Sequence, residues 1–313
     1  MPENTSLEVK EGTIGIGSSA FRDCSNLTSI TIPEGVTSIG NKAFYGCSSL
    51  TSITIPEGVT SIGDGAFQYC SSLTSITLPE GVTSIGEKTF SGCSSLTSIT
   101  IPESVTSIGE RAFYDCSSLT SINIPEGVTS IGERTFSGCS SLTSITLPEG
   151  VTSIGGYAFY NCSSLTSITI PEGVTELFAN TFNECSALKE LTLGKGLRKI
   201  EAGALESCTA LEKITIHATQ PPAADGFIFS DATYENATLY VPQGSMSKYQ
   251  VMTGWSGFYN IVEFDPNTAI YPSMINNNSS GVIYNLHGCK VTDTENLKGG
   301  IYIINGRKVV IED

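Results

Sequence analysis

The sequence predicts a repeat solenoid, in which the chain coils around one long core and carries a parallel β-sheet. A unit of 23 residues recurs from near the N-terminus to Ile216, and the apolar residues occupy the same places in every unit. One such unit cannot bury its apolar side alone, whereas a stack of units forms a continuous core. We expect about nine units, the first of them incomplete, wound into a right-handed coil.

Residues 50–72 represent the unit. Residues 50–55 follow the pattern Leu-x-x-Leu-x-Leu, and residues 53–55 alternate between apolar and polar side chains, as a strand with one buried face requires. Pro56 ends that strand because it has no N–H to donate, and a turn follows. Residues 59–62 alternate again and predict a short second strand. The apolar side chains within residues 66–70 are spaced for one 3₁₀ or helical turn, which closes the coil.

The sequence divides into four parts. Residues 1–216 form the solenoid, and residues 217–264 form a C-terminal capping segment. Residues 265–280 are rich in Asn, Ser and Pro and predict a linker, and residues 281–313 form a small β tail. We interpret Trp255, the single tryptophan, as part of the packing of the cap, and the alternative is a residue that stacks on a ligand.

The tail carries short apolar runs that predict strands at residues 282–286, 289–291, 301–304 and 308–311. An Asn-Gly pair at residues 305–306 separates the last two runs. Such a pair between apolar runs is a strong signal for a tight hairpin. We therefore expect a small antiparallel β-sheet in this tail.

Cysteine recurs once per unit, which argues against a disulfide framework. The recurring residues are Cys24, Cys47, Cys70, Cys93, Cys116, Cys139, Cys162, Cys185 and Cys208. Stacked one per coil, their Cα atoms would lie about 5 Å apart, within reach of a bridge, but their Cβ atoms would point the same way. We interpret them as reduced, buried, small apolar groups. A metal ladder is the alternative, although the unit places no His or second Cys beside them.

The chain is acidic, with a formal net charge of −15. This balance argues against a nucleic-acid partner, because Lys and Arg hold the phosphates of nucleic acids. No apolar run is long enough for a membrane-spanning helix, and the N-terminus lacks the basic and apolar regions of a signal peptide. The sequence begins partway through a unit, so we expect that a leader segment has been removed.

No sequence pattern predicts catalysis. The two histidines, His217 and His287, lie in different regions, and neither has the neighbours of a catalytic dyad or triad. Glycine-rich phosphate loops and the common metal-binding motifs are absent from the sequence. We therefore expect no enzyme activity, no cofactor and no bound metal, with both histidines in structural or surface roles.

One glutamate per unit predicts an acidic column along one edge of the coil. Its members are Glu34, Glu57, Glu80, Glu103, Glu126, Glu149 and Glu172. Like charges at strand spacing repel one another. Lys42, Lys88, Arg111 and Arg134 would compensate them if the fold brings these cations to the same edge. A solvated acidic edge is one interpretation, and weak binding of divalent cations is the other.

The first candidate binding surface is the strand face, a flat and uncharged sheet of hydroxyl groups at the exposed strand positions. Its candidate residues are Thr51, Ser52, Thr54, Thr74, Ser75, Thr77, Thr97, Ser98 and Thr100. The face lacks the aromatic and Arg anchors that dominate interface energies, so its affinity would depend on repetition. The alternative is a solvated β surface without a ligand.

The second candidate surface is the variable ridge, formed by the residues that differ between units on either side of the Ala-Phe pair. Tyrosines gather at these positions, and tyrosine is enriched where proteins contact partners. The candidate contacts are Tyr45, Tyr69, Tyr114, Tyr157 and Tyr160.

The unit resembles the 23-residue leucine-rich repeat of the BspA type, which also occurs in treponemal surface proteins. The resemblance rests on the pattern Leu-Thr-Ser-Ile-Thr-Ile-Pro-Glu-Gly-Val-Thr-Ser-Ile-Gly-x-x-Ala-Phe-x-x-Cys-Ser-Ser, as it stands at residues 50–72, and covers about two thirds of the chain. It implies a leucine-rich-repeat solenoid. Ordinary leucine-rich repeats carry Asn or Cys three residues after the last strand Leu. Gly58 holds that place here, so we expect no asparagine ladder.

The same resemblance implies a function. Members of the BspA family are regarded as adhesins for extracellular-matrix proteins, and the tail is similar to the C-terminal tails of exported Bacteroidetes proteins. Some of those tails are sorting signals that are later trimmed. The resemblance therefore implies a non-catalytic protein at the cell surface or outside the cell, with an extracellular protein or glycan as its partner. The alternatives are a structural spacer or surface-layer component for the chain, and an ordinary small β-domain for the tail.

Overall fold

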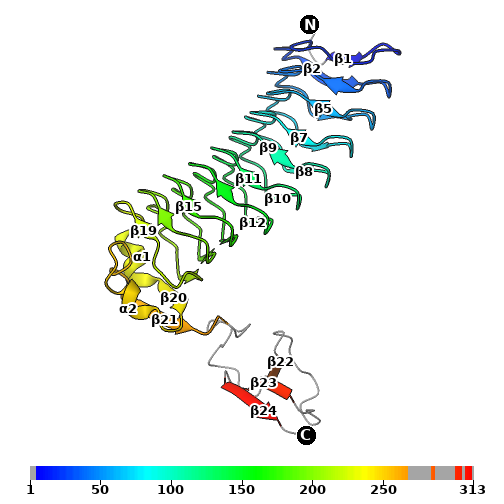
Figure 1. The fold of residues 1–313 in the computed structure, drawn as a ribbon. Coiled ribbons are helices and arrows are strands. Elements are labelled where there is room, and N and C mark those ends of the chain that lie inside the picture. Colours follow the sequence, from blue (N-terminus) through cyan, green and yellow to red (C-terminus); the bar gives the residue numbers. More distant parts are fainter. Residues whose placement is uncertain (1–4, 267–282, 286–299, 305–306, 312–313) are drawn as a thin grey trace.

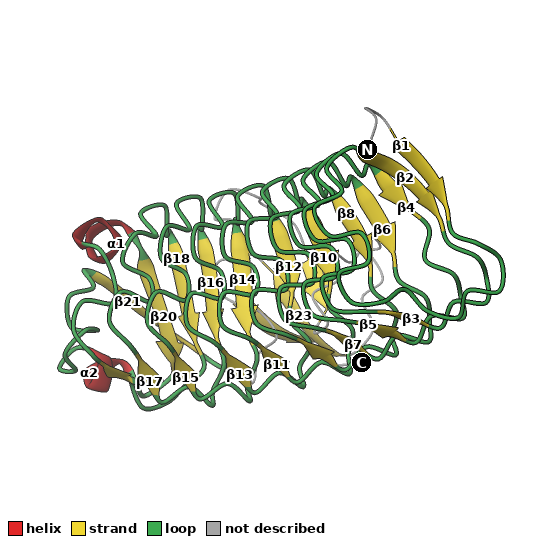
Figure 2. Cartoon of the chain, turned by 90° about the horizontal axis from the view of Figure 1, so that it is seen from above, coloured by secondary structure: helices red, strands yellow, loops and turns green. Residues whose placement is uncertain are grey.

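The computed structural model shows an elongated solenoid whose coils stack along one axis, which confirms the predicted fold class (Figure 1). The structure describes residues 5–266, 283–285, 300–304 and 307–311. Seen from above, the coils place two rows of strands on different sides of the core (Figure 2). Each coil gives one strand to a first sheet, and most coils give a second, shorter strand to a second sheet.

The first sheet is a row of strands along the solenoid, and the strands that pair in it are parallel. In chain order they form three ladders of three, two and seven strands. Its strands are β1 (Thr5–Glu8), β2 (Leu27–Thr31), β4 (Ser52–Ile53), β6 (Ser75–Thr77), β8 (Ser98–Thr100), β10 (Ser121–Asn123), β12 (Ser144–Thr146), β14 (Ser167–Ile170), β16 (Glu190–Leu193), β18 (Lys213–Ile216), β20 (Thr238–Pro242) and β21 (Asn260–Phe264).

The second sheet is also parallel and consists of two-residue strands. They are β3 (Ser38–Ile39), β5 (Ser61–Ile62), β7 (Ser84–Ile85), β9 (Ser107–Ile108), β11 (Ser130–Ile131), β13 (Ser153–Ile154), β15 (Glu176–Leu177), β17 (Lys199–Ile200) and β19 (Ala223–Ala224). Two short helices, α1 (Asp231–Asn236) and α2 (Met246–Tyr249), lie near the C-terminal end of the solenoid (Figure 1).

The register follows the sequence period, so each residue lies beside its own counterpart in the next coil. Ser75 pairs with Ser98 and Thr77 with Thr100, for example. The alternation within each strand then sends one column of side chains inward and its neighbours outward. Ile76 is buried between the exposed Ser75 and Thr77. The repeat therefore produces columns of identical side chains, as the sequence predicts.

The core consists of these stacked columns. The Phe column makes this plain: neighbouring rings are nearly parallel, with centroids 5.2 to 5.6 Å apart and interplanar angles of 2° to 15°. The rings belong to Phe21, Phe44, Phe67, Phe90, Phe113, Phe136, Phe159 and Phe182. All of them except the first are fully buried. Each interior ring contacts one ring on either side, so the aromatic column joins neighbouring coils.

The segment around each Phe is a series of tight turns. The i→i+3 hydrogen bonds of the predicted 3₁₀ turn are present, as from the Ala43 N–H to the Gly40 carbonyl at 3.2 Å. They alternate with bonds to the next coil, as from the Phe44 N–H to the Ala66 carbonyl at 2.7 Å. The chain therefore does not wind into a helix here, because every second amide bonds across the stack instead of within its own turn.

The cysteine column forms a second ladder inside the core. From Cys47 to Cys208, each thiol donates to the carbonyl oxygen of the Phe in the preceding unit, with Sγ–O distances of 3.1 to 3.2 Å. The nine cysteines from Cys24 to Cys208 are free, and all but Cys24 are buried. The cysteine side chains therefore do more than pack in the core as small apolar groups. Their thiols satisfy buried carbonyls, the task that the asparagine ladder performs in other leucine-rich repeats.

The first sheet continues beyond Ile216, into the segment that the sequence indicates as a cap. β20 pairs with β18, and β21 pairs with β20, both in parallel. The spacing is no longer that of the repeat, because Lys213 pairs with Thr238 and Thr238 with Asn260. The capping segment therefore adds irregular coils to the same stack. Its standing as a separate domain remains a prediction.

Aromatic side chains close the core at this end. Trp255 is fully buried and contacts Phe229 and Tyr249 edge to face, with centroids 5.6 and 5.4 Å apart. Its indole N–H donates to the Pro222 carbonyl at 2.8 Å. The Tyr249 hydroxyl donates to the Ala218 carbonyl at 2.6 Å. Trp255 is therefore a core residue of the cap, and its polar group is satisfied inside it.

The described part of the tail is a three-stranded antiparallel sheet of β22 (Ile283–Asn285), β23 (Gly300–Ile304) and β24 (Arg307–Ile311). These strands match three of the four predicted runs, and β23 and β24 pair as the predicted hairpin requires. The strand predicted at residues 289–291, the Asn-Gly pair at 305–306 and most of the predicted linker lie outside the described residues.

Replacing a ring in the middle of the Phe column removes contacts with two coils at once. We expect Phe113→Ala to lower the free energy of unfolding by about 3–5 kcal/mol, because it leaves a cavity in a fully buried site. Denaturant unfolding followed by circular dichroism measures this loss. Phe21→Ala is the matched control, since Phe21 is only partly buried and its ring stacks on Phe44 alone. Equal losses for both variants would contradict the ladder.

The buried thiols should resist alkylation in the folded protein. Burial raises the pKa of Cys47 and of Cys185 to about 12, so their reactive thiolate forms are scarce at pH 8. We expect iodoacetamide to label Cys24, which is only partly buried, much faster than these residues. Peptide mapping by mass spectrometry reads out each site, and guanidinium should abolish the difference. Rapid native labelling of Cys185 would be the contrary result.

Candidate functional site

The strand face lies on the outer side of the first sheet, and the structure exposes all nine residues that the sequence names there. Its first column uses its hydroxyl hydrogens internally. Thr51 donates to the Thr28 carbonyl at 3.3 Å, and Thr97 donates to the Thr74 carbonyl at 3.0 Å. The same bond recurs as far as Thr166. Thr51, Thr74 and Thr97 therefore offer a partner only their methyl groups and oxygen lone pairs.

The other two columns of the strand face are exposed hydroxyls on either side of a buried Ile. Ser75 and Thr77 of β6 lie directly beside Ser98 and Thr100 of β8. Strands in a sheet are about 4.8 Å apart, so the hydroxyls form a regular two-column array. Such an array can donate and accept hydrogen bonds along its whole length. The array is uncharged, and no single position within it is distinctive.

The strand face changes character in the last coils. Glu190 and Lys213 replace the Ser of the repeat, and they pair with Ser167 and with each other in the sheet. Tyr240 follows in the Thr column, beside Thr215. The candidate residues from Thr51 to Thr100 do not include these positions. The break in the repeat at residues 190–195 was the sequence signal that marked them.

A hollow of about 310 Å³ lies at this C-terminal part of the strand face. Its lining comes from β14, β16 and β18 and from the turns that follow these strands, and it includes Thr192, Gly194 and His217. His217 is half-buried and packs edge to face against Phe264, with centroids 5.4 Å apart. Burial is the main cause that lowers the pKa of His217, so its imidazole is neutral at pH 7.

The variable ridge holds the predicted tyrosines in two clusters. In the first, the Arg22 guanidinium lies 4.8 Å from the ring centroid of Tyr45, which contacts Tyr69 edge to face. In the second, Arg134 lies 4.5 Å from the centroid of Tyr157, which contacts Tyr160.

The tyrosine hydroxyls of the ridge also have partners. The Tyr160 hydroxyl donates to Glu184 at 2.7 Å. Tyr114 belongs to an earlier unit than the second cluster, and its side chain counteracts the burial that raises the pKa of Asp115. Much of the aromatic surface on this ridge is therefore engaged within the molecule.

The ridge also holds backbone in the left-handed conformation. Lys88, Arg111 and Arg134 have φ angles of 53° to 56° at equivalent positions, and Tyr69 has a φ of 61° at a second position of the unit. Residues other than Gly and Asn adopt this left-handed backbone conformation at a cost of about 1–2 kcal/mol each. The stack maintains it because the amides in these turns bond to the next coil.

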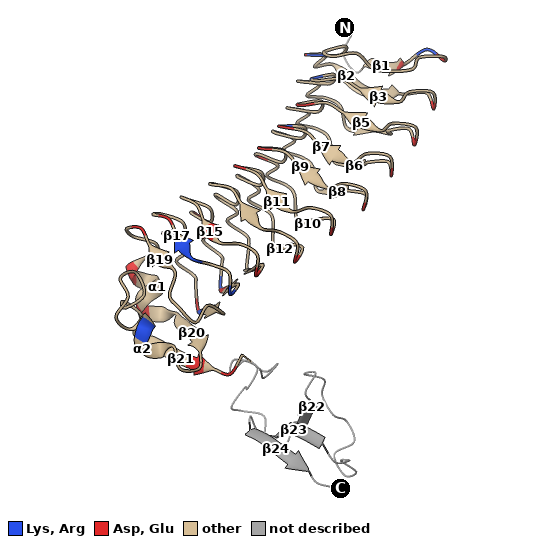
Figure 3. Cartoon of the chain, in the orientation of Figure 1, with Lys and Arg blue, Asp and Glu red and all other residues tan. Residues whose placement is uncertain are grey.

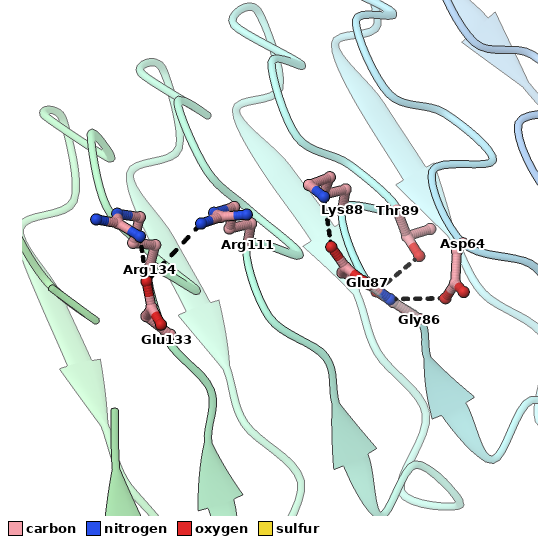
Figure 4. A network of polar contacts seen from close by, with 8 residues as sticks. All are labelled: Asp64, Gly86, Glu87, Lys88, Thr89, Arg111, Glu133 and Arg134. Atoms are coloured by element: carbon pink, nitrogen blue, oxygen red, sulfur yellow. Dashed lines mark hydrogen bonds and ion pairs between the residues drawn. The ribbon is translucent and has the colours of Figure 1, made fainter. Parts of the chain in front are cut away.

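Ion pairs link the charged residues of the ridge to one another (Figure 4). Lys88 pairs with Glu87, Arg134 pairs with Glu133, and Arg111 lies 3.8 Å from the same Glu133 carboxylate. These cations therefore compensate acids of their own ridge. The expectation that they neutralise the column from Glu34 to Glu172 does not hold for these three.

The glutamate column is exposed at the turns that follow the first-sheet strands, and acidic residues mark these turns in Figure 3. Glu172 pairs with Lys195 at its C-terminal end. Among the described residues, no three or more His, Cys, Asp or Glu side chains form a group that could hold a metal ion. Within the same part of the chain, no helix is long and apolar enough to span a membrane.

The class of protein is now defined: a leucine-rich-repeat solenoid with extended surfaces rather than a single deep cleft. A family model of six repeat copies, described as the BspA type leucine rich repeat region, matches residues 3–120 and 106–221. The chain belongs to the BspA-type leucine-rich repeat family. No curated protein matches the sequence.

Solved bacterial structures are similar to the chain. A leucine rich repeat protein of Treponema pallidum is 36% identical, with 51% of this chain and 77% of that chain covered and a TM-score of 0.49. A leucine rich cell surface protein of Faecalibacterium prausnitzii is 30% identical, with 87% and 76% covered and a TM-score of 0.47. The pneumococcal vaccine antigen PcpA is 18% identical, with 83% and 79% covered and a TM-score of 0.49.

The last coils carry an ion-pair cluster whose strength depends on pH. The Lys199 ammonium lies 2.8 Å from Glu176, 2.9 Å from Glu201 and 3.2 Å from Asp225. The hydrogen bond from Lys199 is the main cause that lowers the pKa of Glu201, and the Ala179 N–H adds to it. A carboxyl group with a lowered folded pKa stabilises the protein above its unfolded pKa and loses this contribution as the pH falls through the folded value.

We expect Lys199→Met to lower the melting temperature at pH 7, because three carboxylates then face one another without a cation. The difference in melting temperature between the variant and the wild type should shrink below about pH 4.5, which is the pKa of Glu201 in the unfolded chain. Thermal unfolding between pH 3 and pH 8 measures this. Lys189→Met is the control, since the Lys189–Glu212 pair is exposed and isolated. A deficit that stayed constant over this pH range would argue against the cluster.

Proposed function

We propose that the protein is a non-catalytic binding scaffold of the cell surface or the extracellular space, which engages a macromolecule through its strand face. One observation supports this proposal above the others. The outer side of the first sheet carries the exposed residues of the same columns from coil to coil, and it ends in the distinctive residues Glu190, Lys213 and Tyr240.

The chemistry of the face indicates how it would bind. A single Ser or Thr hydroxyl adds little to affinity, since it exchanges one hydrogen bond with water for another. Many equivalent hydroxyls allow a long partner to make many such contacts at once, and linked contacts raise the overall affinity steeply. The charged and aromatic residues of the last coils supply the anchors that the uniform part of the face lacks.

The family supports the location and the class of partner. Membership in the BspA-type family favours an adhesive role, and the resemblance implies an extracellular-matrix protein as the ligand. A structural spacer is the second candidate function. The near-identity of the strand-face columns favours it, because repetition alone is enough to set a length.

Binding assays on immobilised matrix proteins separate the two functions. We expect saturable binding in surface plasmon resonance, and we expect Ser98→Asp to weaken it at least tenfold by placing a charge on the strand face. Ser107→Asp is a matched control, because Ser107 is also an exposed serine before a buried Ile, on the second sheet. Absence of saturable binding to every matrix protein would favour the spacer. Equal effects of both variants would exclude the strand face as the contact surface.

A further inference from the structure

The hollow on the strand face lies where two substitutions occur at one place in the repeat. In the regular units a proline follows the first-sheet strand, as Pro171 follows β14. Gly194 and His217 occupy this place after β16 and β18. Both residues line the hollow. The backbone is too close to accept any side chain at Gly194, since a Cβ would lie 2.6 Å from the Pro171 carbonyl oxygen.

The lining of the hollow is polar and apolar in about equal parts. Thr169, Thr192 and Thr215 follow one another in register on β14, β16 and β18, and the first two contribute accessible hydroxyls while Thr215 is buried. The carboxylates of Glu149 and Glu172 line it as well. Its volume lies near the lower end of the roughly 300–1,000 Å³ typical of small-molecule sites. The size therefore suits one small ring, and the lining suits a ligand that is rich in hydrogen-bonding groups.

The charges around the hollow nearly cancel. Glu172 forms an ion pair with Lys195, and the Lys213 ammonium lies 3.7 Å from the Glu190 carboxylate. An anionic ligand would meet the carboxylate of Glu149, and a cationic ligand would meet Lys213. Burying either charge without a partner is costly. A neutral ligand avoids both penalties.

Tyr240 adds an aromatic group beside the row of threonines. It lies on β20, directly paired with Thr215, and is half-buried. A tyrosine offers an apolar ring together with a hydroxyl. Sugars have the matching chemistry, since a pyranose carries hydroxyls around its edge and C–H groups on its faces.

We propose that this hollow binds one neutral sugar ring, as a terminal or internal residue of a glycan. The proposal rests on the binding function proposed above and assigns a ligand class to one part of the strand face. Thr169 and Thr192 would supply hydroxyls, and Glu149 and Glu172 would accept hydrogen bonds from the sugar. Tyr240, which lies one strand beyond the lining, would pack against the part of the glycan that leaves the hollow. A single ring in a site of this size binds weakly, with a Kd on the order of 1 mM.

Saturation-transfer NMR of the full chain with neutral monosaccharides tests the proposal. The probes are glucose, galactose, mannose and N-acetylglucosamine, together with their disaccharides. We expect saturable transfer to at least one of them and a loss of at least tenfold in affinity for Thr192→Val, which removes one hydroxyl and keeps the shape. Thr129→Val is the matched control, since Thr129 is an exposed threonine just before β11 of the second sheet, outside the strand face, and it should leave the affinity unchanged.

Two further probes, inorganic phosphate and a lysine-containing peptide, distinguish other ligand classes. Saturable binding of either one, lost in Thr192→Val while no sugar binds, would overturn the proposal. It would also be overturned if no probe binds, or if Thr129→Val and Thr192→Val weaken sugar binding equally. Matrix-protein binding that persists without sugar binding would refute the sugar site and leave the proposed scaffold function intact. Loss of both would refute both.

Discussion

The structure depends on one constraint, that every coil must meet its neighbours in register. Because the period is constant, like side chains stack on like, and the polar groups use this arrangement. The Thr97 hydroxyl and the Cys116 thiol both donate to carbonyls of the preceding unit. The rings of the Phe column likewise contact the rings of the neighbouring units. Many of the hydrogen bonds and aromatic contacts of the repeat thus run along the stack, and a single unit in isolation would lose both its core and the hydrogen bonds that join neighbouring coils.

The sequence predicted the parts of the fold that follow from periodicity. Apolar columns, the two strands per unit and the parallel pairing all result from side chains that recur at fixed spacing. The extension of the sheet to β20 and β21 was harder to predict, because the spacing there differs from the repeat. The thiol ladder was also missed, since a sequence pattern shows that Cys93 is buried but not which carbonyl its thiol approaches.

The candidate sites, too, combine features that the sequence predicts with features that it does not predict. The exposure of Ser98 and Thr100 follows from strand alternation and was predictable. The clustering of Tyr157 with Arg134 was not, because it depends on left-handed turns that the sequence does not reveal. The close approach of two backbones at Gly194, beside the hollow, is visible only in the structure. The substitution of Gly for Pro was visible in the sequence, but its consequence for the surface was not.

The register of the hydroxyl ladder also bears on how such a protein changes in length. Removing residues 74–96 would join Leu73 directly to Thr97, and each remaining threonine would still find a carbonyl one unit away. Recombination between near-identical units can thus shorten or lengthen the solenoid without creating a new junction in its core. The residues around Gly194 lie outside the near-identical units and would remain the same. The length of the solenoid and the chemistry at its C-terminal end can therefore vary independently of each other.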